Sequence, residues 1–250
     1  MKKNYYYNKA QVNFYDIINA EYVEDKKFYL DKIRNAKGPV LEIGCGTGRI
    51  FCEAFKSGAD IYGIDQSVLM LEKLKEKIDK SAHYRVQVID ALEYKPKNKF
   101  NLIIAPFRMF MHILTVEDQL KFMSNVYENL EDNCEFVFNV FNPHLGRIQT
   151  GDKENLRFEG EYALGRILKF YDSSKPDVIN QCQHVTFRFE WDEDGEIRVG
   201  SFSFPMRYSF RFELQHLVER AGFKSFNIYR DFDYNVLNGE FKEFVVVCRK

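Results

Sequence analysis

The sequence lacks the features that mark several protein classes. No apolar run reaches the length of a membrane-spanning helix, so we expect no membrane-embedded part. The five cysteines are scattered without the paired spacing of metal ligands, and no apolar segment follows the lysines near residue 1. We therefore expect a cytoplasmic protein with no metal site. The charges of the acidic and basic side chains nearly cancel. The net charge of −1 argues against duplex DNA as a substrate.

The chain does contain enough apolar residues for a large core. Its 250 residues are 45% hydrophobic, which suits one large domain or a domain with an insertion. After residue 48, apolar strand patterns alternate with helical ones, and this alternation predicts a parallel sheet covered on both faces. We expect N-terminal helices and a core in residues 1–141, an antiparallel insertion in 142–205, and the last part of the core in 206–250.

Residues 142–205 read as strands without intervening helices. Apolar and polar side chains alternate from Val185 to Trp191, a period of two that is typical of a half-buried strand. Asp194 and Gly195 can form the turn into a second strand, residues 197–204. This segment therefore predicts a hairpin with one apolar face.

Glycines at alternate positions end the first predicted core strand. The run Leu41–Gly48 closes with Gly44, Gly46 and Gly48, where the backbone can take a positive φ and approach a ligand closely. A dinucleotide fingerprint needs a further glycine at the position of Arg49, so NAD or FAD is disfavoured. The next strand, residues 61–64, ends in Asp65, where a ribose-binding acid belongs in a βαβ unit.

With these residues, the sequence resembles the class I S-adenosylmethionine-dependent methyltransferases. Residues 65–71 resemble that family's Asp-x-Ser-x-x-Met-Leu motif, and residues 88–92 resemble its next motif. The resemblance implies a Rossmann-like seven-stranded α/β sheet, mostly parallel with its last strand antiparallel, and S-adenosyl-L-methionine as the cofactor. It implies the following donor-binding residues: Tyr15, Glu42, Gly44, Cys45, Gly46, Gly48, Asp65, Gln66, Met70, Asp90, Ala91, Leu92, Ala105 and Phe107.

The resemblance also implies roles for some of these residues. Glu42 would reach the donor's ammonium group, Asp65 its ribose and Asp90 its adenine amino group. The carbonyl of Ala105, at the end of a strand predicted over 100–105, would also contact the ammonium. Glu42 and Asp90 could instead cap neighbouring helices, because acids are favoured near helix starts in any case.

Tyr15 and His112 are the candidate catalytic residues. Tyr7–Ala10 and Phe14–Asp16 loosely match a segment that closes over the cofactor in the family's small-molecule N-methyltransferases, which makes Tyr15 a lid candidate. Tyr15 could equally pack a helix on the core. His112 follows the strand after which the acceptor should bind, and its ordinary pKa suits a general base. A structural histidine is the alternative.

The loop 105–112 also lacks the Asp/Asn-Pro-Pro-Tyr/Phe motif of many nucleic-acid amino methyltransferases. We therefore expect methyl transfer to nitrogen or oxygen of a small molecule, by a monomer or homodimer, with the insertion covering the acceptor. The alternatives are an RNA or protein methyltransferase, a donor-binding regulator without turnover, and a nicotinamide-dependent oxidoreductase.

Overall fold

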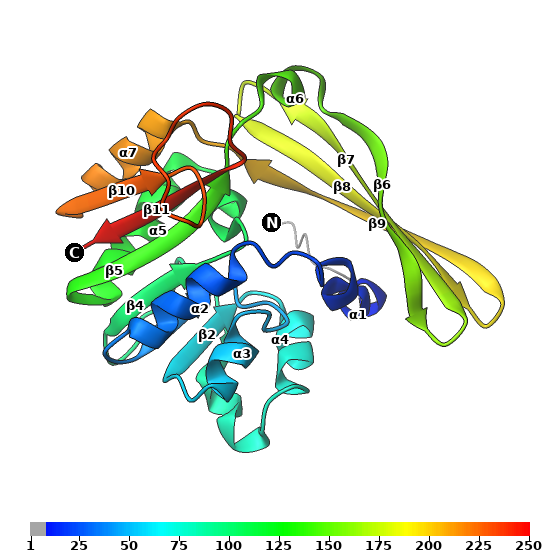
Figure 1. Ribbon diagram of the computed structural model, residues 1–250, viewed down its shortest axis with the longest axis horizontal. Coiled ribbons are helices and arrows are strands. Elements are labelled where there is room, and N and C mark those ends of the chain that lie inside the picture. Colours follow the sequence, from blue (N-terminus) through cyan, green and yellow to red (C-terminus); the bar gives the residue numbers. More distant parts are fainter. Residues whose placement is uncertain (1–8) are drawn as a thin grey trace. The chain divides into compact units, whose positions relative to one another are not determined.

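The computed structural model describes residues 9–250, so Tyr7 and Asn8 of the N-terminal motif lie outside the described part (Figure 1). The chain divides into two compact units. We call residues 23–142 with 208–250 the core unit, and residues 9–22 with 143–207 the sheet unit. Within residues 9–250, we find no helix with the length and hydropathy of a membrane-spanning segment.

Within the described residues, the core unit is built on a seven-stranded sheet of order β10-β11-β5-β4-β1-β2-β3. β11 is antiparallel to both of its neighbours, β10 and β5, and the pairs among β1 to β5 are parallel. The predicted fold class is therefore confirmed. The strands are β1 Val40–Ile43, β2 Ile61–Asp65, β3 Val86–Val88, β4 Phe100–Ala105, β5 Leu130–Phe141, β10 Ser225–Tyr229 and β11 Glu243–Arg249.

Helices cover both faces of this sheet. Figure 1 shows α2 and α3 on one face and α5 and α7 on the other. Two of these helices begin with a side-chain cap: Ser67 Oγ accepts from the Met70 amide, and Thr115 Oγ1 accepts from the Asp118 amide. The helices are α2 Lys26–Asn35, α3 Phe51–Lys56, α4 Val68–Lys75, α5 Val116–Asn129 and α7 Arg211–Arg220, with 3₁₀ turns η1 Lys80–Arg85 and η2 Met109–His112.

The strand register brings three chain segments to one edge of the sheet. Ile43 at the end of β1 pairs with Ile64 of β2, and Glu42 pairs with Ile104 of β4. Because these strands are parallel, the loops that leave their carboxyl ends lie side by side. Ligands bind at this edge in open α/β sheets.

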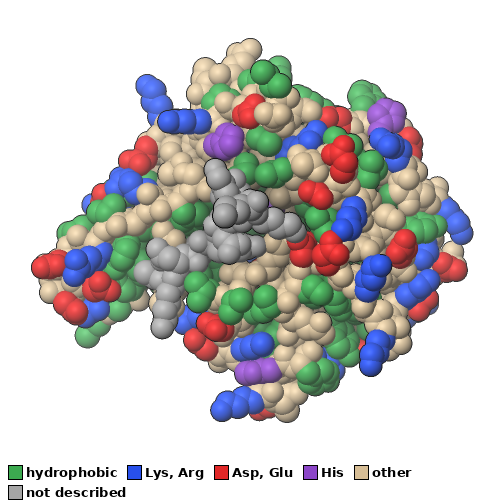
Figure 2. Space-filling view, turned by 180° about the vertical axis from the view of Figure 1, so that it is seen from behind, with side chains coloured by type: hydrophobic (Ala, Val, Ile, Leu, Met, Phe, Trp, Pro, Cys, Tyr) green, Lys and Arg blue, Asp and Glu red, His purple; other side chains and the backbone are tan. Residues whose placement is uncertain are grey.

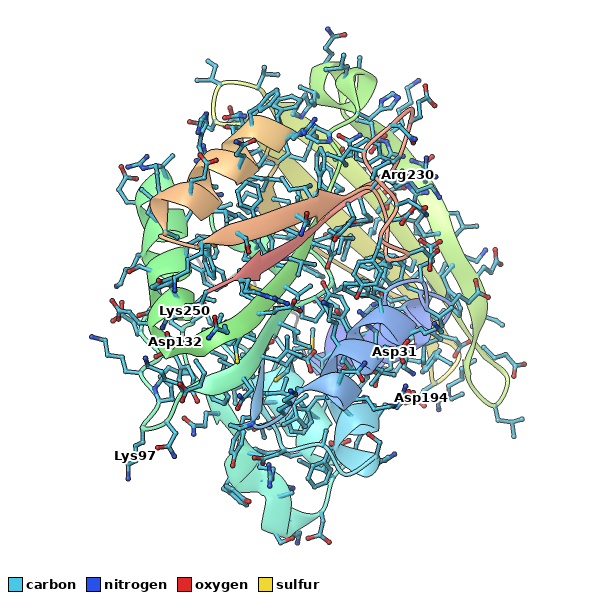
Figure 3. All side chains as sticks on the ribbon, turned by 60° about the vertical axis from the view of Figure 1, so that its left-hand side comes forward. Asp31, Lys97, Asp132, Asp194, Arg230 and Lys250 are labelled. Atoms are coloured by element: carbon cyan, nitrogen blue, oxygen red, sulfur yellow. The ribbon has the colours of Figure 1, made fainter. Side chains whose placement is uncertain are left out.

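The opposite edge of the sheet is held by the last residue described. Lys250 donates through Nζ to the carbonyl oxygens of Tyr127 and Leu130, over 2.8 and 2.7 Å, and Figure 3 shows it beside Asp132. β5 begins at Leu130, which pairs with Phe100 at the start of β4 before the register of the two strands shifts. This end of the sheet is therefore structural.

The sheet unit is a four-stranded antiparallel sheet with two helices. Phe187 faces Phe202 across β8 and β9, and the turn between these strands has a positive φ at Asp194 and Gly195, as in a type I′ hairpin. The predicted hairpin is present. The elements are α1 Lys9–Ile18, α6 Leu145–Thr150, β6 Asp152–Ala163, β7 Arg166–Asp177, β8 Cys182–Glu193 and β9 Glu196–Arg207.

The first helix, α1, belongs to the sheet unit, whereas the sequence pattern predicts it together with the core in residues 1–141. The ring of Phe14 lies 5.0 Å from that of Tyr162 and 5.5 Å from that of Trp191, centroid to centroid. Phe14 is buried in an aromatic cluster that includes Phe170 and Phe189. The apolar side of α1 thus packs on the aromatic face of the four-stranded sheet, and the boundary of this unit falls at residues 143 and 207 instead of 142 and 205.

Candidate functional site

The turn after β1, residues 44–48, has a backbone that glycine alone adopts readily. The φ angles are 73°, 54° and 89° at Gly44, Gly46 and Gly48. A Cβ on Gly44 would also lie 2.4 Å from Cγ of Met109, so the turn packs tightly against the loop that follows β4. A Cβ on Gly46 would meet nothing within 4 Å, which leaves open space beside this residue for a ligand.

The turn is joined to the end of β2 by hydrogen bonds. The amides of Gly44 and Cys45 donate to the Ile64 carbonyl oxygen over 2.8 and 3.1 Å. The Gly46 amide donates to Asp65 Oδ2 over 2.9 Å. The two segments that the sequence assigns to the donor are therefore in direct contact.

Asp65 is fixed in place before any ligand binds. Its Oδ1 accepts from the Ser67 amide at 2.8 Å, while Oδ2 accepts from Gly46. Desolvation raises the pKa of Asp65, and the backbone hydrogen bonds from Ser67, Gly46 and Gln66 act against that rise. A carboxylate held in this way keeps lone pairs that can accept hydrogen bonds from hydroxyl groups.

Glu42, on β1, is a buried acid with unused hydrogen-bonding capacity. Among the described residues, its Oε2 atom has no hydrogen-bond partner. Burial raises the pKa of Glu42 to about 8; the Arg49 cation opposes this shift, and the carboxylates of Asp25 and Asp65 add to it. A backbone hydrogen bond from Phe51, the first residue of α3, also reaches Glu42. The helix-capping interpretation therefore has support, and one oxygen is still unpartnered.

The adenine-binding candidates follow β2 and β3. Gln66 is exposed and Met70 is buried. Asp90 Oδ1 accepts from the Leu92 amide over 2.9 Å, so Asp90 also stabilises its own turn. Asn125 of α5, which sequence reasoning missed, donates to the carbonyl oxygens of Ala91 and Leu92 over 3.1 and 3.0 Å.

The loop after β4 has an unusual backbone. Ala105 is buried at the end of the strand, and the non-glycine residues Phe107 and Arg108 both lie in the left-handed region, with φ of 55° and 63°. Such residues cost roughly 1 to 3 kcal/mol each and persist only where the surrounding structure holds them. Strain of this kind clusters at functional sites.

His112 ends the 3₁₀ turn η2 in the same loop. Part of its side chain is open to solvent, while the surrounding protein desolvates the ring and lowers its pKa to about 4. This shift favours the neutral form of the ring. The imidazole is therefore uncharged at pH 7 and has one nitrogen that can accept a proton.

Two ion pairs near this loop were missed by sequence reasoning. Arg49 donates to both carboxylate oxygens of Asp25, over 2.7 and 2.6 Å, and its guanidinium carbon lies 4.8 Å from the centroid of the Phe107 ring. Arg108 pairs with the buried carboxylate of Glu243 on β11. Arg49 stands directly after the glycine run, which is a weak signal. Glu243 carries no local signal at all.

Tyr15 is the predicted site residue that belongs to the sheet unit. It lies on α1, whose neighbour Phe14 packs on the aromatic face. Its predicted role as a lid therefore stays a prediction. The remaining donor-binding candidates and His112 lie in the core unit. Within residues 9–250, no group of three or more His, Cys, Asp or Glu side chains is arranged to hold a metal ion.

Comparison with known proteins identifies the domain. The model of a family described as a methyltransferase domain matches residues 40–133, which contain the glycine turn, Asp65 and the loop after β4. Residues 40–133 form a class I S-adenosylmethionine-dependent methyltransferase domain. The family and the cofactor expected from the sequence are thereby confirmed.

A curated relative is similar over part of the chain. A malonyl-[acyl-carrier protein] O-methyltransferase from Ilyobacter polytropus is 30% identical over 106 residues, which are 41% of this chain and 37% of that protein. The chain thus spans about a third of the length of the curated relatives that it matches.

Solved structures are similar over most of their length. The CcbJ methyltransferase from Streptomyces caelestis has a TM-score of 0.73 at 24% identity, covering 90% of this chain and 89% of its own. The sugar N-methyltransferase KedS8 from Streptoalloteichus has a TM-score of 0.76 at 14% identity, covering 95% and 92%. These likenesses show the fold. The roles of single residues in the methyltransferase domain remain predictions.

Proposed function

We propose that this protein transfers a methyl group from S-adenosyl-L-methionine to a nitrogen or oxygen atom of a small molecule. The observation that carries the proposal is the buried Oε2 atom of Glu42 on β1, directly before the glycine turn, which has no hydrogen-bond partner within residues 9–250. A donor with an ammonium group would donate a hydrogen bond to this oxygen, and its positive charge would favour the carboxylate form of Glu42. KedS8, whose structure is similar, is a sugar N-methyltransferase, which supports a small-molecule acceptor.

The residues present fit the donor. Glu42 would accept from its ammonium group, the Ala105 carbonyl would accept from the same group, and Asp65 would accept from the ribose hydroxyls. Space beside Gly46 would admit the amino-acid part. The adenine would lie among four residues that follow β2 and β3, namely Met70, Asp90, Ala91 and Leu92, with Gln66 beside them.

When bound, the donor supplies an electrophilic methyl group on a sulfonium. The task of the chain is then to align the acceptor with that methyl group and to exclude water, and orientation alone can supply on the order of 7–11 kcal/mol. Phe107 and His112 lie on the loop that would face the acceptor. A neutral His112 could accept the proton that an amine or hydroxyl loses, and desolvation would itself favour an amine in its uncharged form.

The cellular setting and partners belong to the same proposal. We propose a cytoplasmic protein, a monomer or homodimer, with Tyr15 acting as a lid. All five cysteines are free, as expected in a reducing compartment. Figure 2 shows basic and acidic side chains interspersed over the visible face, which favours a small molecule over a nucleic acid.

Calorimetry followed by an acceptor screen tests the proposal. We expect heat on titration with S-adenosylmethionine and with its demethylated product, S-adenosylhomocysteine, and none with NAD. Amino sugars, other amines and phenols are then incubated with protein and donor, and mass spectrometry detects a gain of one methyl group. Donor binding without product from any acceptor would favour a regulator, and folded protein that binds neither compound would refute the proposal.

A further inference from the structure

The two left-handed residues Phe107 and Arg108 need something to hold them. Both side chains end in contacts with charged groups, and the contacts run in different directions from the loop. The loop also matters to the donor side, because Met109 follows directly and its side chain lies against Gly44.

The first contact runs from Phe107 to the start of α2. The Phe107 ring stacks on the Arg49 guanidinium, which binds both oxygens of Asp25. Asp25 stands at the N-cap position of α2, but its side chain makes no cap hydrogen bond, and it is fully buried. Its carboxylate thus orients Arg49 instead of serving the helix, and a bidentate pair fixes the guanidinium plane on which Phe107 lies.

The second contact runs from Arg108 to the same helix by another route. Arg108 Nε donates to Glu243 Oε1 over 2.9 Å, and Glu243 Oε2 accepts from Asn139 Nδ2 over 3.1 Å. Asn139 Oδ1 accepts from the Tyr29 hydroxyl over 2.9 Å. Asn139 and Tyr29 are fully buried, and Glu243 is nearly so. A change at Tyr29 would therefore be transmitted through buried hydrogen bonds to Arg108.

Asp25, the N-cap residue of α2, lies one helical turn before Tyr29, and the Tyr29 amide donates to the Asp25 carbonyl. We propose that α2 positions the acceptor loop, with Asp25 acting through Arg49 and Tyr29 acting through Asn139 and Glu243 to hold the left-handed pair. This inference rests on the proposed function, since it assigns the loop to the acceptor. Asp25 and Tyr29 are positioning residues that need not touch either substrate.

Hydrogen exchange of the loop amides tests the proposal without any substrate. The amides of Met109, Met111 and Ile113 are hydrogen-bonded to carbonyl groups within the loop. In Tyr29→Phe and in Asp25→Asn, exchange of peptides spanning 105–113 should rise about fivefold, the size expected from losing one buried hydrogen bond. Tyr29→Phe is the decisive variant, because it removes one oxygen atom and leaves the buried ring in place.

Matched substitutions serve as controls. Asp31→Asn changes an acid on the exposed side of α2, labelled in Figure 3, which pairs with Arg34. Tyr84→Phe removes a hydroxyl from an exposed tyrosine of the same unit. Both controls should leave exchange of the loop unchanged. The proposal is wrong if folded Tyr29→Phe exchanges like the wild type, or if its exchange rises equally over the whole sheet.

Kinetics with an acceptor from the screen provides a second readout. Tyr29→Phe should lower kcat about fivefold, while its Kd for S-adenosylhomocysteine changes less than about twofold. A purely structural role would change both values or neither, and either result would contradict positioning. Because exchange is measured without donor or acceptor, failure of this inference is distinguishable from failure of the proposed function, which calorimetry decides.

Discussion

The donor side and the acceptor side of the core unit are built in different ways. On the donor side, Gly46 and Asp65 are hydrogen-bonded across 19 residues of sequence, and Asp65 and Ser67 across two. On the acceptor side, Arg108 bonds to Glu243 across 135 residues, and Tyr29 bonds to Asn139 across 110. The donor side is therefore assembled by a local βαβ unit, whereas the acceptor loop depends on the completed sheet.

This difference allows donor binding and acceptor specificity to vary independently. A local unit can keep one cofactor site while distant residues change around it. The acceptor loop is connected by hydrogen bonds to β11, β5 and α2, so its shape can differ among proteins that share the donor motif. Substitutions on the two sides should accordingly affect different measured quantities.

Replacing Asp65 should have the largest effect, and only on the donor side. Asp65→Ala removes hydrogen bonds to the ribose hydroxyls worth roughly 1.5–3 kcal/mol each, so the Kd for S-adenosylhomocysteine should rise about 100-fold or more. Calorimetry measures the change. Asp60→Ala, which removes an exposed carboxylate paired with Arg85, is the control. Unchanged affinity in folded Asp65→Ala would contradict the ribose assignment.

Replacing Gly44 should affect both sides, because this residue is where they touch. In Gly44→Ala, the new Cβ is strained by the φ of 73° and collides with Met109, so the free energy of unfolding should fall by about 2 to 4 kcal/mol. Gly58→Ala is the matched control, with a φ of 88° but open space around its Cβ, and should cost about 1 kcal/mol. Equal losses in urea denaturation would show that the contact with Met109 is unimportant.

Much of the donor side could be predicted from the sequence, because its signals are local. Positive φ at Gly44 and Gly46 follows from the glycine spacing, and the position of Asp65 follows from the strand before it. Caps such as Ser67 are read from neighbouring residues for the same reason. The family assignment depended on these signals, and comparison confirmed it.

The acceptor side could not be predicted in the same way. No periodicity links Arg108 to Glu243 or Tyr29 to Asn139, since these pairs form only when the strand order is complete. The left-handed backbone conformation of Phe107 and Arg108 could not be predicted either, because tertiary contacts there override the local backbone preference. The packing of α1 on the inserted sheet could not be predicted for a related reason, because an amphipathic helix pattern does not specify what the helix packs against.

Replacing His112 should affect the acceptor side alone. His112→Ala should lower kcat about 100-fold if the ring accepts a proton, with donor affinity near normal. The measurement is turnover of the acceptor from the screen, together with calorimetry of the donor. His83→Ala is the control, because His83 bonds to the Lys75 carbonyl, remote in sequence from the loop. A loss of stability with no specific kinetic effect would support a structural role for His112.

A change of pH should have the smallest effect on donor binding, and this effect comes from titration of Glu42. In the free protein burial raises the pKa of Glu42 to about 8, so the group is mostly protonated at pH 7. An adjacent ammonium favours the carboxylate, so binding should release a proton. Affinity for S-adenosylhomocysteine should then increase as pH rises toward 8, by at most about tenfold per pH unit, and level off above it.

Calorimetry in buffers of different ionisation enthalpy measures that proton directly, at about pH 6 to 7, where the ligand's own ammonium stays charged. Glu42→Gln should remove the proton release, and Asp31→Asn should keep it. The free energy of unfolding of the donor-free protein should show the opposite trend. Because the pKa of Glu42 is raised in the folded state, its protonation stabilises the fold fully below about pH 4.5, and this stabilisation is lost as pH rises through about 8. If proton release persists in Glu42→Gln, a group other than Glu42 loses the proton on binding. The proposed contact between Glu42 and the donor's ammonium group, from which the function of the donor side was inferred, would then be wrong.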